Sequence, residues 1–136
     1  MNQKGMTLIE IMIVLAILAG IMAAIVTNVR GRLAEANIRQ AKIQIGQIEN
    51  ALEFYRLACS YRYPTTEEGL EALVEAPGSC PGWGPEPYLR SVPRDPWGNP
   101  FSYESDGSTY EIISFGRDGR PGGTGENADI SSEDLN

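Results

Sequence analysis

The sequence has 136 residues, enough for one small domain and a short additional segment, with a formal net charge of -7 and no histidine. Eight acidic side chains but only two arginines, Arg117 and Arg120, lie between residues 104 and 136, and this acidic excess excludes nucleic acid as a natural partner. Without histidine the chain lacks the commonest general base and the usual ligand of catalytic zinc, and because no nucleophile, nucleotide or zinc motif replaces it, the sequence predicts a protein that is not an enzyme.

The chain opens with an apolar segment, residues 6–29, in which Glu10 is the one charged residue. At about 1.5 Å per residue this segment would form a helix of roughly 36 Å, enough to cross a hydrocarbon core of about 30 Å. A carboxylate inside such a helix costs about 2.5–3.5 kcal/mol near the centre of the membrane and less toward an end. Glu10 is therefore either tolerated at the membrane interface or retained for a function.

The residues around Glu10 form a motif. Residues 4–10 read Lys-Gly-Met-Thr-Leu-Ile-Glu, which resembles the prepilin motif of type IV pilins and type II secretion pseudopilins. The resemblance implies that residues 1–5 are a leader, and that a prepilin peptidase cuts between Gly5 and Met6 and methylates the new amino group of Met6. It implies that residues 6–29 remain as a transmembrane and assembly helix. It also implies that Glu10 pairs with the Met6 ammonium of a neighbouring subunit, which gives the buried charge a partner.

The same resemblance implies a single-pass protein of the bacterial inner membrane, with the leader in the cytoplasm and residues 30–136 in the periplasm. The charge bias points the other way, because one lysine precedes the apolar segment and several arginines follow it. Two residues depart from the family pattern: Met6 stands where phenylalanine is usual, and Thr27 stands where a proline is common. Without that proline, the sequence leaves open whether the helix is locally unwound near Thr27.

An amphipathic pattern continues the helix beyond the apolar segment. The spacing predicts that this helix ends near Ala58, which gives it roughly 50 residues in total. Its core-facing stripe steps by three and four positions, with polar residues on the other faces. The stripe consists of Ile38, Ala41, Ile45, Ile48, Leu52 and Tyr55.

Shorter elements are predicted after the helix. Thr65 and Glu68 have capping-box spacing and predict a short helix over about residues 67–75. Residues 101–104 and 109–115 are strand-like runs separated by Asp-Gly-Ser, and they predict a hairpin. A small antiparallel sheet packed on the long helix would complete an α+β domain.

Two further stretches narrow the resemblance to the major pseudopilins of type II secretion systems. Residues 63–73 read Tyr-Pro-Thr-Thr-Glu-Glu-Gly-Leu-Glu-Ala-Leu, and residues 93–100 read Pro-Arg-Asp-Pro-Trp-Gly-Asn-Pro. From the residues alone, the second stretch is turn chemistry around Trp97 that fixes a loop. The resemblance implies a helical homo-oligomer, the periplasmic pseudopilus, whose growth drives folded proteins across the outer membrane. Its implied partners are minor pseudopilins, inner-membrane secretion components and the prepilin peptidase; the alternative is a type IV pilin subunit of a surface fibre.

The end of the chain, residues 114–130, combines acidic residues with five glycines. Composition alone favours a flexible acidic tail, and no EF-hand spacing is present. The stretch resembles the C-terminal calcium loop of major pseudopilins. In such a loop the calcium ion would be held by oxygen ligands. Many relatives have aspartate where this chain has Ala128, so one further ligand comes from Asn127 or Glu126 or is absent. The ligands that the resemblance implies are the side chains of Asp118 and Asp129, the carbonyls of Phe115 and Arg120, and Asn127.

Cys59 and Cys80 are the two cysteines of the chain. In an oxidising periplasm they could form a disulfide that closes a loop of about 20 residues and contributes roughly 3 kcal/mol. The alternative is two separately buried free thiols. Their spacing excludes a Cys-x-x-Cys metal or redox motif.

Overall fold

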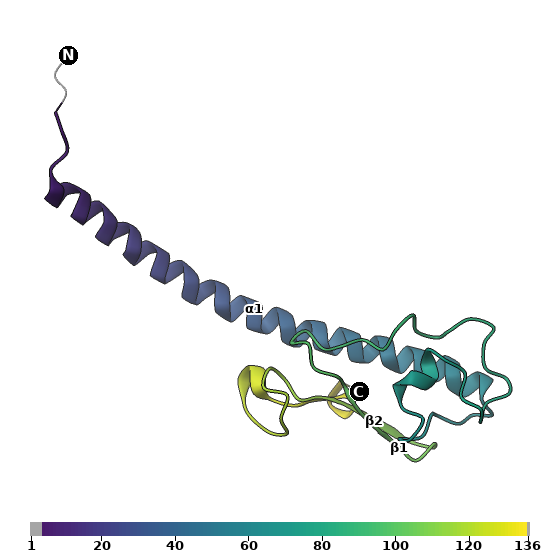
Figure 1. Cartoon of the computed structure of the whole chain (residues 1–136). Helices are drawn as coiled ribbons and strands as arrows, with labels where there is room; N and C mark the ends of the chain where they lie inside the picture. Colours follow the sequence, from purple (N-terminus) through teal and green to yellow (C-terminus); the bar gives the residue numbers. More distant parts are fainter. Residues whose placement is uncertain (1–3, 136) are drawn as a thin grey trace. The chain divides into compact units, whose positions relative to one another are not determined.

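The structure, a computed structural model, describes residues 4–135. It divides into two compact units, Met1–Glu35 and Ala36–Asn136. Helix α1, Leu8–Ala58, has 51 residues and belongs to the first unit in its first half and to the second unit in its second half (Figure 1). The predicted long helix and its end at Ala58 are confirmed.

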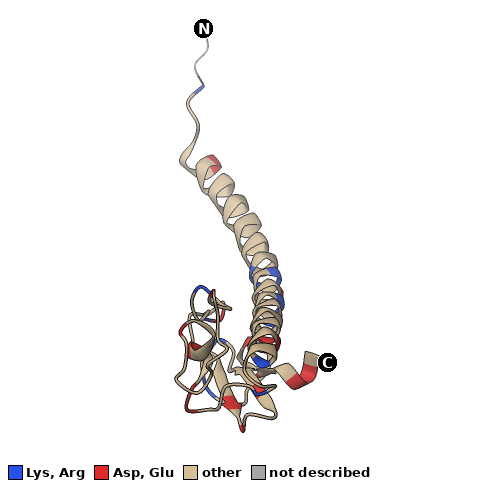
Figure 2. Cartoon of the chain, turned by 90° about the vertical axis from the view of Figure 1, so that its right-hand side faces the viewer, with Lys and Arg blue, Asp and Glu red and all other residues tan. Residues whose placement is uncertain are grey.

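The first unit is the apolar half of α1. Among the described residues, α1 is the one helix long and apolar enough to cross a membrane. Its most apolar stretch of 18 residues has a mean hydropathy of 2.8, and 0% of that stretch is buried. In Figure 2 the helix ribbon is tan between one acidic residue near its start and the first basic residues farther along, in agreement with residues 11–29, which carry no charge. The helix continues through Thr27, whose Oγ1 donates to the carbonyl of Ala24 at 2.9 Å. In this structure the helix is therefore not unwound at Thr27, and the Thr27 hydroxyl is satisfied by the preceding turn.

The second unit contains a three-stranded antiparallel sheet in the order β1-β2-β3. β1 spans Ser102–Ser105, β2 spans Tyr110–Ser114 and β3 spans Ile130–Ser131. The predicted hairpin is confirmed, with strand ends shifted by about one residue. The third strand was not predicted, because two residues are too few to show an alternating pattern.

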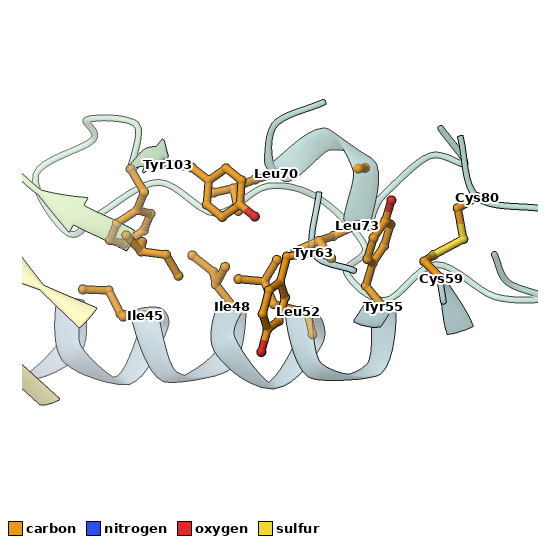
Figure 3. Close-up of a cluster of buried hydrophobic side chains, with 14 of the residues drawn as sticks. Ile45, Ile48, Leu52, Tyr55, Cys59, Tyr63, Leu70, Leu73, Cys80 and Tyr103 are labelled. Atoms are coloured by element: carbon orange, nitrogen blue, oxygen red, sulfur yellow. A yellow bond between two sulfur atoms is a disulfide. The ribbon is translucent and has the colours of Figure 1, made fainter. Parts of the chain in front are cut away.

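The core of the second unit lies between α1 and the rest of the domain (Figure 3). The predicted stripe of α1 faces it, with Ile38 partly buried at its edge. Fully burying an aliphatic or aromatic side chain contributes roughly 1.5–3 kcal/mol, so this stripe fixes the domain on the helix. The side chains that meet there are those of Ala41, Ile45, Ile48, Leu52, Tyr55, Leu70, Leu73, Tyr103 and Ile112.

The predicted helix over residues 67–75 is wrong in type and length. The capping box itself forms, because the Thr65 amide donates to Glu68 Oε2 at 2.9 Å and the Glu68 amide donates to Thr65 Oγ1 at 3.4 Å. The chain then makes a turn and a four-residue 3-10 helix, Leu70–Leu73. Gly69 adopts φ 64, a left-handed conformation that no α-helix can continue through.

α1 ends in a tight cap beside a disulfide. Cys59 is bonded to Cys80, with 5.2 Å between their Cα atoms. The amide of Tyr61 donates to the carbonyl of Arg56 at 2.8 Å, the bond that closes a Schellman-type helix end. Ser60 and Tyr61 both have positive φ, 57 and 59, which is unfavourable for residues with a Cβ.

A polar network ties the same two segments together. Arg62 donates to both carboxylate oxygens of Glu68, at 3.2 and 3.3 Å, and the Ser79 hydroxyl donates to Glu68 as well. Burial alone would raise the pKa of Glu68, but the hydrogen bonds from Ser79 and Arg62 outweigh it and lower the pKa. The loop that carries Cys80 is thus attached beside the end of α1 by the disulfide and by the hydrogen bonds of Ser79 with Arg62 and Glu68.

Candidate functional site

The predicted cleavage position lies in an exposed segment before α1. Gly5 and Met6 are both exposed and lie outside the helix, which begins at Leu8. A Cβ placed on Gly5 would meet no other atom within 4 Å, and Met6 is 72% exposed. The bond between them is therefore open to an enzyme in the described chain.

Glu10 has a partner within its own chain. Its amide donates to Thr7 Oγ1 at 3.3 Å, and the Thr7 amide donates to Glu10 Oε2 at 3.5 Å. This reciprocal pair is a capping box at the start of α1, where a carboxylate also interacts favourably with the helix dipole. Sequence reasoning missed it, although Thr-x-x-Glu is the spacing that had identified the box at Thr65.

The C-terminal loop, defined as residues 115–129, is closed on itself. A Cβ on Gly116 would lie 2.5 Å from the Glu126 carbonyl oxygen, and one on Gly123 would lie 2.5 Å from the Asn127 carbonyl oxygen. The Arg117 amide donates to the Glu126 carbonyl at 2.8 Å. The two ends of the loop therefore meet backbone to backbone, and all five of its glycines have positive φ: Gly116, Gly119, Gly122, Gly123 and Gly125.

The loop holds two exposed carboxylates with backbone partners. Asp118 Oδ1 accepts the Arg120 amide at 3.1 Å, and both carboxylate oxygens of Asp129 accept the Gly122 amide, at 3.1 and 3.0 Å. Within residues 4–135, neither aspartate forms an ion pair. The closed loop thus points lone pairs of both predicted aspartates to solvent.

One ion pair favours Asn127 over Glu126 as the further ligand. Arg117 Nη1 lies 3.3 Å from Glu126 Oε2, so that carboxylate already has a cationic partner. The Asn127 side chain makes no hydrogen bond to any described residue and keeps its amide oxygen available. The carbonyls of Phe115 and Arg120 belong to the same loop, close in sequence to Asp118.

These donors are all oxygen atoms, the kind of ligand that a hard cation takes. No group of three or more acidic or cysteine side chains that could hold a metal occurs in the part of the chain that the structure describes. A cation here would bind two carboxylates together with amide and carbonyl oxygens, the ligand types that calcium takes.

The turn at residues 93–100 also belongs to this region, a link that sequence reasoning missed. Asn99 Nδ2 donates to the Gly116 carbonyl at 3.1 Å. No local sequence pattern could show this contact, because 17 positions separate the two residues. Trp97, at the centre of this turn, is half-buried.

Comparison with known proteins covers both units. A family model described as "Type II secretion system (T2SS), protein G" matches residues 28–133, more than half of the chain. The chain belongs to this protein G family. A second family model, "Prokaryotic N-terminal methylation motif", matches residues 1–26 and includes Gly5, Met6 and Glu10. The predicted family is therefore confirmed.

Relatives within the protein G family match nearly the whole chain. The type II secretion system core protein G of Pseudomonas aeruginosa is 42% identical, over 98% of this chain and 96% of the relative. That of Vibrio cholerae is 40% identical, over 98% of this chain and 94% of the relative. The crystal structure of the major pseudopilin from the type 2 secretion system of enterohaemorrhagic Escherichia coli is similar, with a TM-score of 0.62 and 35% identity, over 78% of this chain and 90% of that one.

Proposed function

We propose that the chain polymerises, as a structural subunit of a type II secretion pseudopilus, through the apolar first half of α1. One observation carries the proposal: the most apolar window of this helix is 0% buried. Exposed apolar surface costs roughly 25 cal/mol per Å² in water, so the helix needs lipid around it before assembly and neighbouring subunits after it. The protein G match favours a pseudopilin over the type IV pilin alternative.

We assign the first step of this function to processing at Gly5 and Met6. The exposed, non-helical position of both residues and the methylation-motif match support cleavage between them and methylation of Met6 by a prepilin peptidase. Cleavage would leave an ammonium group one residue before Thr7. The start of the mature helix would then carry a positive charge and the Glu10 carboxylate side by side.

In assembly, the Glu10 carboxylate would accept from the ammonium group of a neighbouring subunit, in place of the Thr7 amide or together with it. A carboxylate that enters an apolar filament interior without a cationic partner is strongly disfavoured. A subunit placed so that its Met6 ammonium reaches Glu10 of the next would satisfy both charges. This pairing would fix the register between subunits.

The test separates the charge of Glu10 from its capping role. Glu10→Gln keeps the capping capacity, since glutamine also serves in capping boxes, and removes the charge; Glu10→Ala removes both. Each variant is expressed with the prepilin peptidase, and cleavage is read by intact mass and polymer by crosslinking. We expect normal cleavage and lost polymer for both. Wild-type levels of polymer from Glu10→Gln would show that the pairing is wrong.

The proposed location is the bacterial inner membrane, with a single pass and with residues 30–136 in the periplasm. The apolar half of α1 and the family fit membrane anchoring, and the Cys59–Cys80 disulfide fits an oxidising compartment. The proposed partners are further copies of the chain, minor pseudopilins and inner-membrane secretion components. Protease protection of spheroplasts, before and after membrane disruption, tests the orientation.

We also propose that the C-terminal loop binds calcium and that calcium stabilises the subunit for assembly. The oxygen donors of Asp118 and Asp129 and the closed backbone support it. A ligand that binds the folded state alone stabilises it by about 2.7 kcal/mol at a concentration of 100 Kd. Thermal unfolding of the full chain in detergent micelles, with excess calcium and with a chelator, measures this effect.

The control for calcium is an aspartate outside the loop. We expect Asp129→Asn to lose most of the calcium-dependent rise in Tm, while Asp134→Asn, an exposed aspartate near the C-terminus, keeps it. Equal Tm values for the wild-type chain in calcium and in chelator would refute the calcium proposal. They would leave the role in the filament untouched.

A further inference from the structure

The turn before the sheet is built around one buried carboxylate. Asp95 is only 4% exposed, and its Oδ1 accepts the amides of Trp97, at 3.1 Å, and of Asn99, at 2.8 Å. Two backbone bonds of 2.9 Å, from the Asp95 amide to the Asn99 carbonyl and from the Gly98 amide to the Asp95 carbonyl, close the same turn. A buried carboxylate is costly unless its oxygens are hydrogen-bonded, and here the bonds fix the backbone up to Asn99.

This turn is attached on two sides. Gln44 Nε2, on α1, donates to the Arg94 carbonyl at 2.9 Å. The hydroxyl of Ser114, at the end of β2, donates to Asp95 Oδ2 at 2.9 Å, and Ser114 is fully buried. The turn is therefore held to the helix and to the strand from which the C-terminal loop departs.

The Asn99 side chain reaches from the turn to the loop. Its amide donates to the Gly116 carbonyl at 3.1 Å, and a Cβ on Gly119 would lie 3.2 Å from that same amide group. The Gly119 amide donates to the Gly116 carbonyl at 3.3 Å. Asn99 thus lies against both ends of the first turn of the loop, which carries Asp118.

We propose that Asn99, held by Asp95, is a positioning residue that sets the backbone of residues 116–120 in the conformation that presents Asp118 and the Arg120 carbonyl to a cation. The part of this inference that concerns a cation rests on the calcium proposal above. A loop fixed from inside the domain loses less conformational freedom when it binds a cation, which increases affinity. The turn at residues 93–100 therefore has a role beyond fixing its own conformation.

The experiment compares two side-chain amides that attach the turn: Asn99 donates to a carbonyl of the loop, and Gln44 of α1 donates to a carbonyl of the turn. Asn99→Ala removes the bond to the loop, and Gln44→Ala removes the bond to α1 and does not touch the loop. Hydrogen exchange of residues 116–122 is measured on the full chain in detergent micelles without calcium. We expect exchange there to rise about three- to tenfold in Asn99→Ala relative to Gln44→Ala, as for the loss of one hydrogen bond.

Calorimetric titration with calcium provides the second measurement. We expect Asn99→Ala to raise the Kd for calcium about three- to tenfold and Gln44→Ala to leave it unchanged. If Asn99→Ala does not fold, Asn99→Asp keeps the shape, removes the donor and repeats the exchange experiment. Equal exchange in the Asn99 and Gln44 variants overturns the positioning role. Absence of calcium binding by the wild-type chain would refute the calcium proposal instead, and exchange would still decide the role of Asn99.

Discussion

Removal of the Cys59–Cys80 disulfide should destabilise the second unit through its unfolded state. The two cysteines are 21 positions apart, and a cross-link over a loop of this length lowers the entropy of the unfolded chain enough to contribute about 3 kcal/mol. For a domain of roughly 100 residues, 1 kcal/mol shifts Tm by about 4–8 °C, so Cys59→Ala/Cys80→Ala should lower Tm by about 12–24 °C. The hydrogen bonds of Ser79 with Arg62 and Glu68 hold the same segments only in the folded state and do not replace this effect.

Trp83 reports this unfolding in a Trp97→Phe background, which removes the second tryptophan of the chain. Its indole donates to the Ala72 carbonyl at 2.7 Å and its backbone amide donates to the Cys80 carbonyl at 3.2 Å, so tryptophan fluorescence of the full chain in micelles follows the loop. Ser79→Ala is the matched control, because it removes two native hydrogen bonds beside the disulfide, the one donated to Glu68 and the one accepted from Arg62, and should cost about 1–2 kcal/mol. A Tm loss in the double variant no larger than that of Ser79→Ala would refute the argument from unfolded-state entropy.

Three further outcomes follow from single side chains. In the folded state the pKa of Glu68 is lowered from its ordinary value of 4.5, so ionised Glu68 stabilises the fold above pH 4.5, and this stabilisation is lost as pH falls through the lowered pKa. The Tm of Glu68→Gln should therefore fall less steeply than that of the wild type below about pH 5. Burial raises the pKa of Tyr103 to about 12, so neutral Tyr103 stabilises the fold fully below pH 10, and this stabilisation is lost as pH rises through 12. Tyr103→Phe should therefore lose less Tm in alkali than the wild type, and an equal loss would contradict this. Gly116→Ala and Gly122→Ala both place a Cβ at positive φ, but only the first would meet the Glu126 carbonyl, at 2.5 Å, so its Tm should fall further.

The features predicted best from the sequence are those set by a long repeating pattern. The end of α1 at Ala58 and the stripe from Ala41 to Tyr55 follow from apolar residues at a helical period, and a repeat of this length leaves no competing structure. The hairpin was also predicted, because its turn residues separate two β-prone runs. In each case the residues that decide the structure are neighbours in the sequence.

The features that were missed depend on contacts over a distance or on a single backbone angle. Gly69 turns a predicted α-helix into a 3-10 turn through its positive φ, and β3 exists only because Ile130 pairs with Ser114 across the sheet. The contact of Asn99 with Gly116 joins two loops that carry no shared pattern. Such contacts follow from the packed fold, so composition could not separate an acidic tail from a closed loop.

The capping box at Thr7 changes what cleavage would do to the start of α1. The helix dipole places partial positive charge there, and the ammonium created at Met6 would add a full one, in a segment that must remain in an apolar environment. The Glu10 carboxylate already contacts the amide of Thr7, so it lies where it can neutralise an ammonium from its own chain or from a neighbour. Glu10→Gln keeps the cap and leaves that ammonium unpaired in both arrangements. Lost polymer with intact cleavage in this variant would therefore report the charge of Glu10 alone, and not the folding of its helix.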